Sequence, residues 1–319
     1  ALPAAFAHLM KVLEQLSDGF DSEVVRGEVH HCPVHPDVLS TKQEGACSEC
    51  QRGLVPRRIP YSFIHARAET PHLKLNLEPH PAPEVGETTR LRIQLQYADE
   101  SPVLETDLWP MHTEIGQVLV TGPDLSDFRH LALEAGEEPG HYGCDFRPRQ
   151  AGKHRLHVVL TPYLTGLPEF HSSDLEVAGA NASPERKRPP VESLSSLVED
   201  GQFHLSVGGT KGRQLRSGEL QLLQLQVFDA EGQPVQMLEP FRNAFAHITA
   251  FYTENGPETG ETVLQLHPTG GDILQDVLRG GPSLAFKIYS PRAGLLRLFC
   301  EVQLNGKRIL APFYVRIVE

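Results

Sequence analysis

Apolar and polar residues alternate along residues 91–97, and the same alternation returns at residues 223–227. Because successive side chains of a strand point to opposite faces, each stretch predicts a β-strand with one buried face. Both stretches run into a turn that ends in Pro-Val, at residues 102–103 and again at residues 234–235. The chain is therefore expected to contain two β-rich blocks of similar design.

A second pair of matching segments follows in the same order. Residues 151–156 read Ala-Gly-Lys-His-Arg-Leu, and residues 293–298 read Ala-Gly-Leu-Leu-Arg-Leu. Two matches in one order indicate an internal duplication. The many glycines and prolines (27 and 26 of 319 residues) favour short strands joined by turns. We therefore predict a mainly β protein with two tandem immunoglobulin-like antiparallel β-sandwiches, over residues 85–178 and 200–319.

The rest of the chain divides into four shorter parts. Residues 1–28 are expected to contain a short amphipathic helix, because apolar residues recur there at spacings of three and four. Residues 29–58 form a small cysteine-bearing module, residues 59–84 a connector, and residues 179–199 a polar linker rich in proline and charge. The last strand, over residues 308–318, should complete the second sandwich, with Pro312 at a sheet edge or bulge.

The cysteine-bearing module has the spacing of a metal site. Cys32 and His35 are separated by two residues, and Cys47 and Cys50 repeat that spacing eleven residues later. Two such pairs can turn four ligands onto one ion, and three thiolates with one imidazole form a structural zinc set. Zinc is the expected ion, although soft sulfur ligands also accept Cu(I) or another thiophilic metal.

Other chemistry for these cysteines has to be weighed. In an oxidising compartment Cys47 and Cys50 could form a disulfide and leave Cys32 free. A thioredoxin-type motif is disfavoured, since no βαβ pattern surrounds the pair. Covalent haem attachment requires a histidine directly after the second cysteine, where this chain has Gln51.

Residues 31–56 resemble the small heavy-metal-binding domain of bacterial copper and cation export proteins. The resemblance is carried by Cys-Pro-x-His-Pro from Cys32, by Gly45, Cys47 and Cys50, and by the closing Leu-Val-Pro at residues 54–56. That family has methionines where this chain has Val34 and Arg52, so the thioether ligands used in copper traffic are missing. The resemblance therefore implies a structural metal more than a transferred one.

The two β-rich blocks are similar to the YtkA-like immunoglobulin-type domains that often accompany this module. In the first block Phe128 and His130 match the family pattern, but Ala132 replaces its second histidine. In the second block His247 and His267 match, so the resemblance implies an incomplete second metal site there. With so few ligands, these histidines are expected to serve mainly as structural hydrogen-bonding residues.

Several classes of function are disfavoured. The formal net charge of −12 argues against a nucleic-acid binder, which needs a basic surface. No apolar run is long enough for a membrane helix, so the chain is not expected to be integral to a membrane, although peripheral contact stays open. The sequence also lacks a nucleophile elbow, a phosphate-binding loop and a His-Glu-x-x-His motif, and we expect no enzyme.

These observations lead to one expectation and one alternative. The sequence starts at Ala1, from which we expect an exported protein of the periplasm or cell envelope. Its expected role is that of a non-enzymatic accessory or scaffold subunit, with a structural metal and a protein partner in a larger envelope or respiratory assembly. The alternative is a periplasmic copper or heavy-metal carrier or resistance protein. Cys144 and Cys300 are expected to be buried thiols, unless a disulfide joins the two blocks.

Overall fold

The computed structural model is mainly β. Among the residues that it describes there is no α-helix, and two short 3-10 turns, η1 (Glu105–Asp107) and η2 (Pro123–Leu125), interrupt the strands. The residues described are 27–31, 39–40, 46–47, 50–59, 71–79, 83–110, 114–125, 127–163, 168–179, 191–208, 214–242, 244–253, 263–266, 268–269 and 280–319. The described residues contain no helix long and apolar enough to cross a membrane. The helix predicted within residues 1–28 lies outside the described residues.

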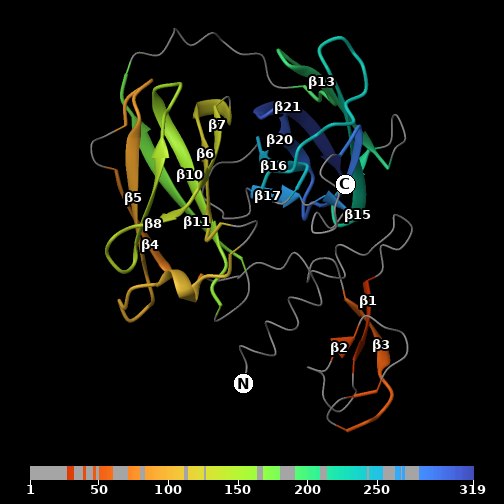
Figure 1. Cartoon of the computed structure of the whole chain (residues 1–319), viewed down its shortest axis with the longest axis horizontal. Helices are drawn as coiled ribbons and strands as arrows, with labels where there is room; N and C mark the ends of the chain where they lie inside the picture. Colours follow the sequence, from red (N-terminus) through yellow and green to blue (C-terminus); the bar gives the residue numbers. More distant parts are fainter. Residues whose placement is uncertain are drawn as a thin grey trace. The chain divides into compact units, whose positions relative to one another are not determined.

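The first sandwich consists of two four-stranded antiparallel sheets (Figure 1). One sheet has the order β4-β5-β9-β8, with β4 Lys74–Pro79, β5 Thr89–Gln96, β9 His141–Phe146 and β8 Glu134–Ala135. The other has the order β11-β10-β6-β7, with β11 Glu169–Val177, β10 Gly152–Leu160, β6 Gln117–Thr121 and β7 Phe128–Ala132. β4 lies within the segment 59–84 for which the sequence predicts a connector, so this sandwich takes in part of that segment.

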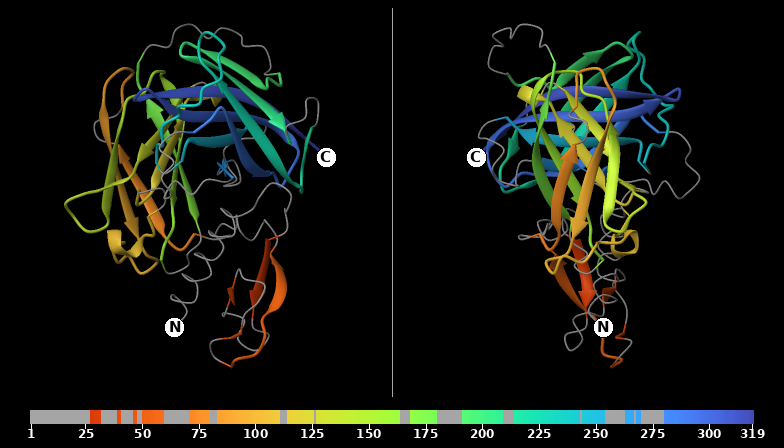
Figure 2. Two further views of the ribbon diagram at one scale, coloured as in Figure 1. Left: turned by 45° about the vertical axis from the view of Figure 1, so that its right-hand side comes forward. Right: turned by 90° about the vertical axis from the view of Figure 1, so that its left-hand side faces the viewer.

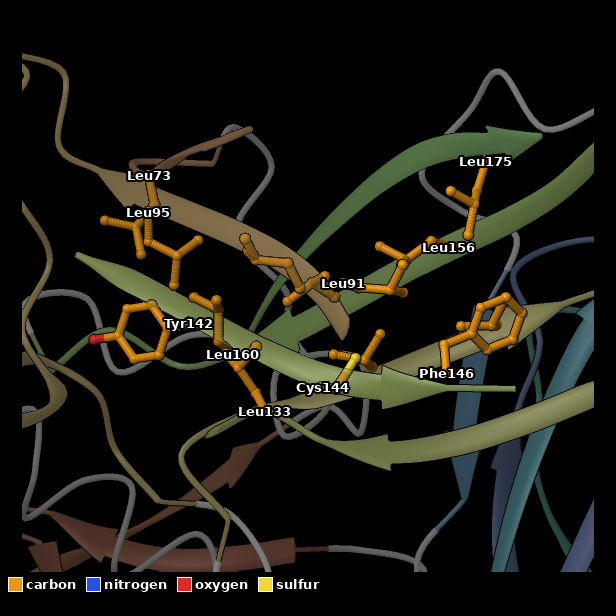
Figure 3. Packing of buried hydrophobic residues seen from close by; sticks show 14 of the residues in the cluster. Leu73, Leu91, Leu95, Leu133, Tyr142, Cys144, Phe146, Leu156, Leu160 and Leu175 are labelled. Carbon is orange, nitrogen blue, oxygen red and sulfur yellow. The ribbon is translucent and has the colours of Figure 1, made fainter. Parts of the chain in front are cut away.

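The core of the first sandwich lies between these sheets. The alternation predicted for residues 91–97 is seen on β5, where Leu91, Ile93 and Leu95 are fully buried. They belong to one apolar cluster with residues from the facing sheet, including Leu156 of β10 (Figure 3). Cys144 of β9 lies in the same cluster (Figure 3). The period of two therefore sorts side chains into core and surface as expected.

The second sandwich consists of two five-stranded sheets (Figure 2). One has the order β12-β13-β15-β19-β18, with β12 Ser195–Val198, β13 Gly201–Val207, β15 Leu220–Phe228, β19 Ser283–Tyr289 and β18 Pro268–Thr269. The other has the order β14-β21-β20-β16-β17, with β14 Leu215–Arg216, β21 Lys307–Val318, β20 Gly294–Leu304, β16 Ala246–Tyr252 and β17 Val263–Leu266. β21 is the predicted final strand, and it pairs antiparallel with β20 along eleven residues. β12 lies within the predicted linker 179–199.

The two sandwiches share one strand order. Removing β12 and β14 from the second leaves β13-β15-β19-β18 and β21-β20-β16-β17, which matches β4-β5-β9-β8 and β11-β10-β6-β7 of the first. The paired sequence segments fall on equivalent strands, β5 with β15 and β10 with β20. Gly152 and Gly294, which begin β10 and β20, both have a positive φ, of 105° and 151°. The topology therefore agrees with a duplicated architecture.

The Pro-Val turns of the two sandwiches are also built alike. After β5, the Val103 amide donates to the Leu95 carbonyl at 3.1 Å, and Pro102 forms an isolated bridge with Gln96. After β15, the Val235 amide donates to the Val227 carbonyl at 3.0 Å. Both valines are buried, which anchors each turn against its own core.

Tyr142 fixes the first of these turns, which leads to a prediction. Its buried hydroxyl donates to the Val103 carbonyl at 2.9 Å. Tyr142→Phe removes this donor and leaves the carbonyl with one bond fewer, so the free energy of unfolding of the first sandwich should fall by about 1 kcal/mol. Urea denaturation would measure this loss. The matched Tyr163→Phe variant alters an exposed tyrosine and should change stability by less, whereas equal losses in both would contradict the role assigned to the Tyr142 hydroxyl.

A third, small sheet belongs to the cysteine-bearing module. It has the order β2-β1-β3, with β1 Gly27–His31, β2 Leu39–Ser40 and β3 Val55–Ile59. β1 pairs antiparallel with β3 from Gly27 opposite Ile59 to His31 opposite Val55. The chain thus has a separate three-stranded sheet over residues 27–59, which extends slightly beyond the module predicted at residues 29–58.

Candidate metal centre and histidine sites

Cys47 and Cys50 lie on a turn closed by backbone hydrogen bonds. The Cys47 amide donates to the Arg52 carbonyl at 2.8 Å, and the Gln51 amide donates to the Cys47 carbonyl at 2.9 Å. Ala46 and Gly53 close the turn with an antiparallel bridge. Gln51, which follows the second cysteine, has a φ of +59°, in the left-handed region. The backbone thus folds back on itself around the Cys-x2-Cys pair.

This turn is joined to one end of the small sheet. The turn leads through Leu54 into β3, whose first residue, Val55, is paired with His31, the last residue of β1. Cys32 directly follows His31 in the sequence. The turn around Cys47 and Cys50 therefore enters β3 at the end of the sheet where β1 ends.

The structure describes two of the four expected ligands. Cys47 is fully buried and Cys50 is partly exposed. Cys32 and His35 lie outside the described residues. Within the described part of the chain, no three His, Cys, Asp or Glu side chains are grouped to hold a metal. Two of the four expected ligands belong to this described part, so the Cys3His site stays a prediction.

His247 has a defined role on β16. Its ring is buried, and its Nε2 lies 2.8 Å from the Phe241 carbonyl oxygen. A carbonyl only accepts, so Nε2 carries the hydrogen and donates it. The ring also packs edge-on against Phe241, with centroids 5.3 Å apart. This geometry favours the hydrogen-bonding role over metal ligation, while His267, the other half of the weak second site, lies outside the described residues.

His130 is placed on the equivalent sheet of the first sandwich. It is buried on β7, directly opposite Leu119 of β6. Ala132, at the position of the missing second histidine, is opposite Gln117. The neighbouring strand thus offers neither His130 nor Ala132 an imidazole, thiolate or carboxylate directly across the sheet.

The main polar cluster of the first sandwich was not anticipated from the sequence. Glu169, at the start of β11, has a fully buried carboxylate. One of its oxygens accepts the His72 amide at 2.9 Å and lies 3.3 Å from His72 Nδ1. The other accepts the Leu73 amide at 3.2 Å and lies 3.2 Å from His171 Nε2. Because β11 and β4 are edge strands of opposite sheets, this carboxylate joins the two sheets along one side of the sandwich.

Hydrogen bonding controls the charge of Glu169. Burial by itself would raise the pKa of this carboxyl group, since it disfavours the charged form. The hydrogen bonds from the His171 ring and from the His72 and Leu73 amides outweigh that effect, and the pKa lies below its ordinary value. The side chain is thus a carboxylate at neutral pH.

The two cysteines of the sandwiches are free thiols in the interior. Cys144 and Cys300 are buried, on β9 and β20 respectively, and neither forms a disulfide. Burial raises the pKa of Cys144 to about 12 and raises the pKa of Cys300 as well. Both are therefore protonated at neutral pH and make poor nucleophiles or metal ligands.

The comparisons with known proteins add little to these observations. A family model described as a domain of unknown function (DUF8832) matches residues 200–319, which is the second sandwich and well under half of the chain. No curated protein matches the sequence. The strand order defines the class of protein: the chain is mainly β, consistent with tandem immunoglobulin-like sandwiches.

Solved structures resemble the chain only remotely. The filamin domain of Lin-41 is 16% identical and covers 34% of this chain and 92% of its own, with a TM-score of 0.23. A mutant alpha-2-macroglobulin from Salmonella is 14% identical, covers 91% of this chain and 19% of its own, and has a TM-score of 0.25. Domains 5–6 of the S-layer protein SbsC are 11% identical and cover 77% of this chain and 99% of their own, with a TM-score of 0.21. The chain thus spans about a fifth of the length of the macroglobulin. No structural or functional relationship is inferred from these TM-scores.

Proposed function

We propose that this chain is a non-enzymatic, exported scaffold or accessory subunit in which Cys32, His35, Cys47 and Cys50 hold one structural metal ion, zinc. The two sandwiches present surfaces to a protein partner in a larger envelope assembly. The observation that carries the proposal is the closed turn around Cys47 and Cys50, which enters β3 at the end of the sheet where β1 runs into Cys32. Three thiolates and one imidazole, brought together there, would form a tetrahedral set suited to zinc.

The polar groups of the sandwiches support a structural role. His247 donates to a backbone carbonyl, and Glu169 bonds to two backbone amides. Cys144 and Cys300 are buried with raised pKa values. In each case a group capable of chemistry is either bonded to the backbone or buried in the interior.

Elemental analysis of the purified chain tests the metal site. We expect about one zinc per chain in the wild type and none in the Cys47→Ala/Cys50→Ala variant, because two ligands do not retain the ion. The Cys144→Ala variant is the matched control and should keep its zinc. The metal site would be contradicted if the wild type contained no metal and Cys47 and Cys50 resisted alkylation until a reductant was added. That result would indicate a disulfide between them. More than one equivalent of copper, lost when His247 is changed to alanine, would favour the carrier.

A further inference from the structure

One end of the first sandwich exposes a cluster of large apolar and aromatic side chains. Trp109, the only tryptophan of the chain, packs against Tyr163 with ring centroids 5.1 Å apart. Tyr163 is 43% exposed, and Leu104 nearby is 44% exposed. We name Leu104, Trp109 and Tyr163 the aromatic patch. In the described part of the chain only five large hydrophobic residues are this exposed, and two of them belong to this patch.

Asp107 holds the patch together. Its carboxylate accepts the Leu104 amide at 2.8 Å, and its backbone carbonyl accepts the Tyr163 amide at 2.8 Å. The Trp109 amide donates to the Thr161 carbonyl at 2.7 Å, so both aromatic residues are also tied through the backbone. The exposed side chains thus rest on a hydrogen-bonded support, as a preformed binding surface requires.

The surroundings of the patch are acidic. The segment 99–107 contains Asp99, Glu100, Glu105 and Asp107 and no lysine or arginine. Glu100 and Glu105 are exposed. The basic side chain that reaches this segment is Lys74, whose Nζ donates to the Ala98 carbonyl at 3.0 Å. Aromatic faces with carboxylates beside them attract cations, because the ring quadrupole and the negative charges act in the same sense.

An aromatic ring of the second sandwich has cations of the same chain over it. Between β15 and β16, the counterparts of β5 and β6, the ring of Phe241 has two guanidinium groups over it. Arg242 lies 5.0 Å and Arg308 5.2 Å from its centroid. Within the described residues of the first sandwich, no lysine or arginine lies over Trp109 or Tyr163. Among the described residues, the Phe241 ring is thus covered by cations of this chain, and the Trp109 and Tyr163 rings are not.

We infer that the aromatic patch binds a lysine- or arginine-rich segment of a protein partner. The cationic side chains would lie on the Trp109 and Tyr163 rings, with Glu105 and Glu100 balancing their charge and Leu104 covering the aliphatic stems. This inference rests on the proposed role as a scaffold for a protein partner and names the chemistry of that partner. It does not involve the metal site.

The single tryptophan makes the test direct. Titration of the full-length chain with a hexa-arginine peptide should change the fluorescence of Trp109 saturably, and added salt should weaken the binding. A hexa-glutamate peptide should have no effect. By anisotropy of a labelled hexa-arginine peptide, Tyr163→Ala and Glu105→Gln should each bind about fivefold more weakly, the loss expected for one such contact.

Two matched variants show whether the effect is local. Met237→Ala removes an exposed apolar side chain of the second sandwich, and Glu176→Gln removes an exposed carboxylate of β11, so both should bind the peptide like the wild type. Circular dichroism checks that each variant is folded. Equal weakening in all four variants, or a response to a neutral oligosaccharide in place of the peptide, would overturn the inference. A zinc-loaded chain that ignores the peptide refutes this docking site alone, and a metal-free chain that binds it refutes the metal site alone.

Discussion

Replacing Glu169 with glutamine should lower the free energy of unfolding of the first sandwich by about 3 kcal/mol. The wild-type carboxylate accepts the His72 and Leu73 amides and bonds to the His171 ring while fully buried. A glutamine retains one acceptor oxygen, and its NH2 group must face one of these donors. The variant thus loses the charge and leaves a buried donor without an acceptor. Urea denaturation followed by circular dichroism would measure the change.

The same residue predicts a dependence on acid. The pKa of Glu169 is lowered in the folded chain, so the unfolded chain binds its proton first as the pH falls. Its contribution to stability is therefore complete above the ordinary glutamate pKa of about 4.3 and is lost as the pH falls through the lower folded value. The difference in unfolding free energy between wild type and Glu169→Gln should narrow over that range.

The exposed Glu176 on the same strand supplies the matched control. Glu176→Gln changes the net charge by the same amount but removes no buried bond, so its stability should stay within about 0.5 kcal/mol of the wild type. If the two variants lost equal stability, or if Glu169→Gln were neutral, the carboxylate would not be joining the sheets.

Removal of the metal should unfold the small sheet and leave both sandwiches intact. A module of about 30 residues is shorter than most chains that fold without a metal or disulfide, so a structural zinc would supply much of its folding free energy. Hydrogen–deuterium exchange is the measurement. After chelation the amides of β1 and β3 should exchange at least about a hundredfold faster, while those of β5 and β20 keep their protection.

The Cys47→Ala/Cys50→Ala variant should show the fast exchange without any chelator, and Cys144→Ala should behave like the wild type. Returning zinc to the chelated wild type should restore slow exchange. Protection of β1 and β3 that survives chelation would show that the sheet does not depend on a metal.

Much of the fold could be predicted from local patterns. The alternation on β5 and β15 marks strands with one buried face, and a glycine marks the start of β10 and of β20. These signals recur in the same order in both sandwiches. Both signals are local. Burial of one face of the pleated sheet requires the period of two, and the positive φ of the turn favours glycine. The shared Pro-Val turn is a local signal of the same kind.

The polar cluster depended on partners that are distant in sequence. Glu169 bonds to residues 96 and 97 positions away, and these contacts exist only once the two sheets face each other. A signal was nevertheless present, because Glu169 and His171 occupy the same face of β11 as the buried Leu175 and Val177. A charged residue on the buried face of a strand needs a hydrogen-bonding or ionic partner. The sequence alone did not identify His72 and Leu73 as the partners. The strand β4 was missed although Leu73, Leu75 and Leu77 alternate with polar residues, which is a local signal of a strand. The strand β12 is short and has little apolar pattern of its own.

The place of the Glu169 bonds in the chain has a mechanical consequence. His72 and Leu73 come immediately before β4, at the point where the chain arriving from the cysteine-bearing module joins the first sandwich. A pull transmitted from that direction reaches these two amides before it reaches any rung of β4. Under tension the two hydrogen bonds to Glu169 would bear the load first, so the edge strand β4 would stay paired with β5 until they break.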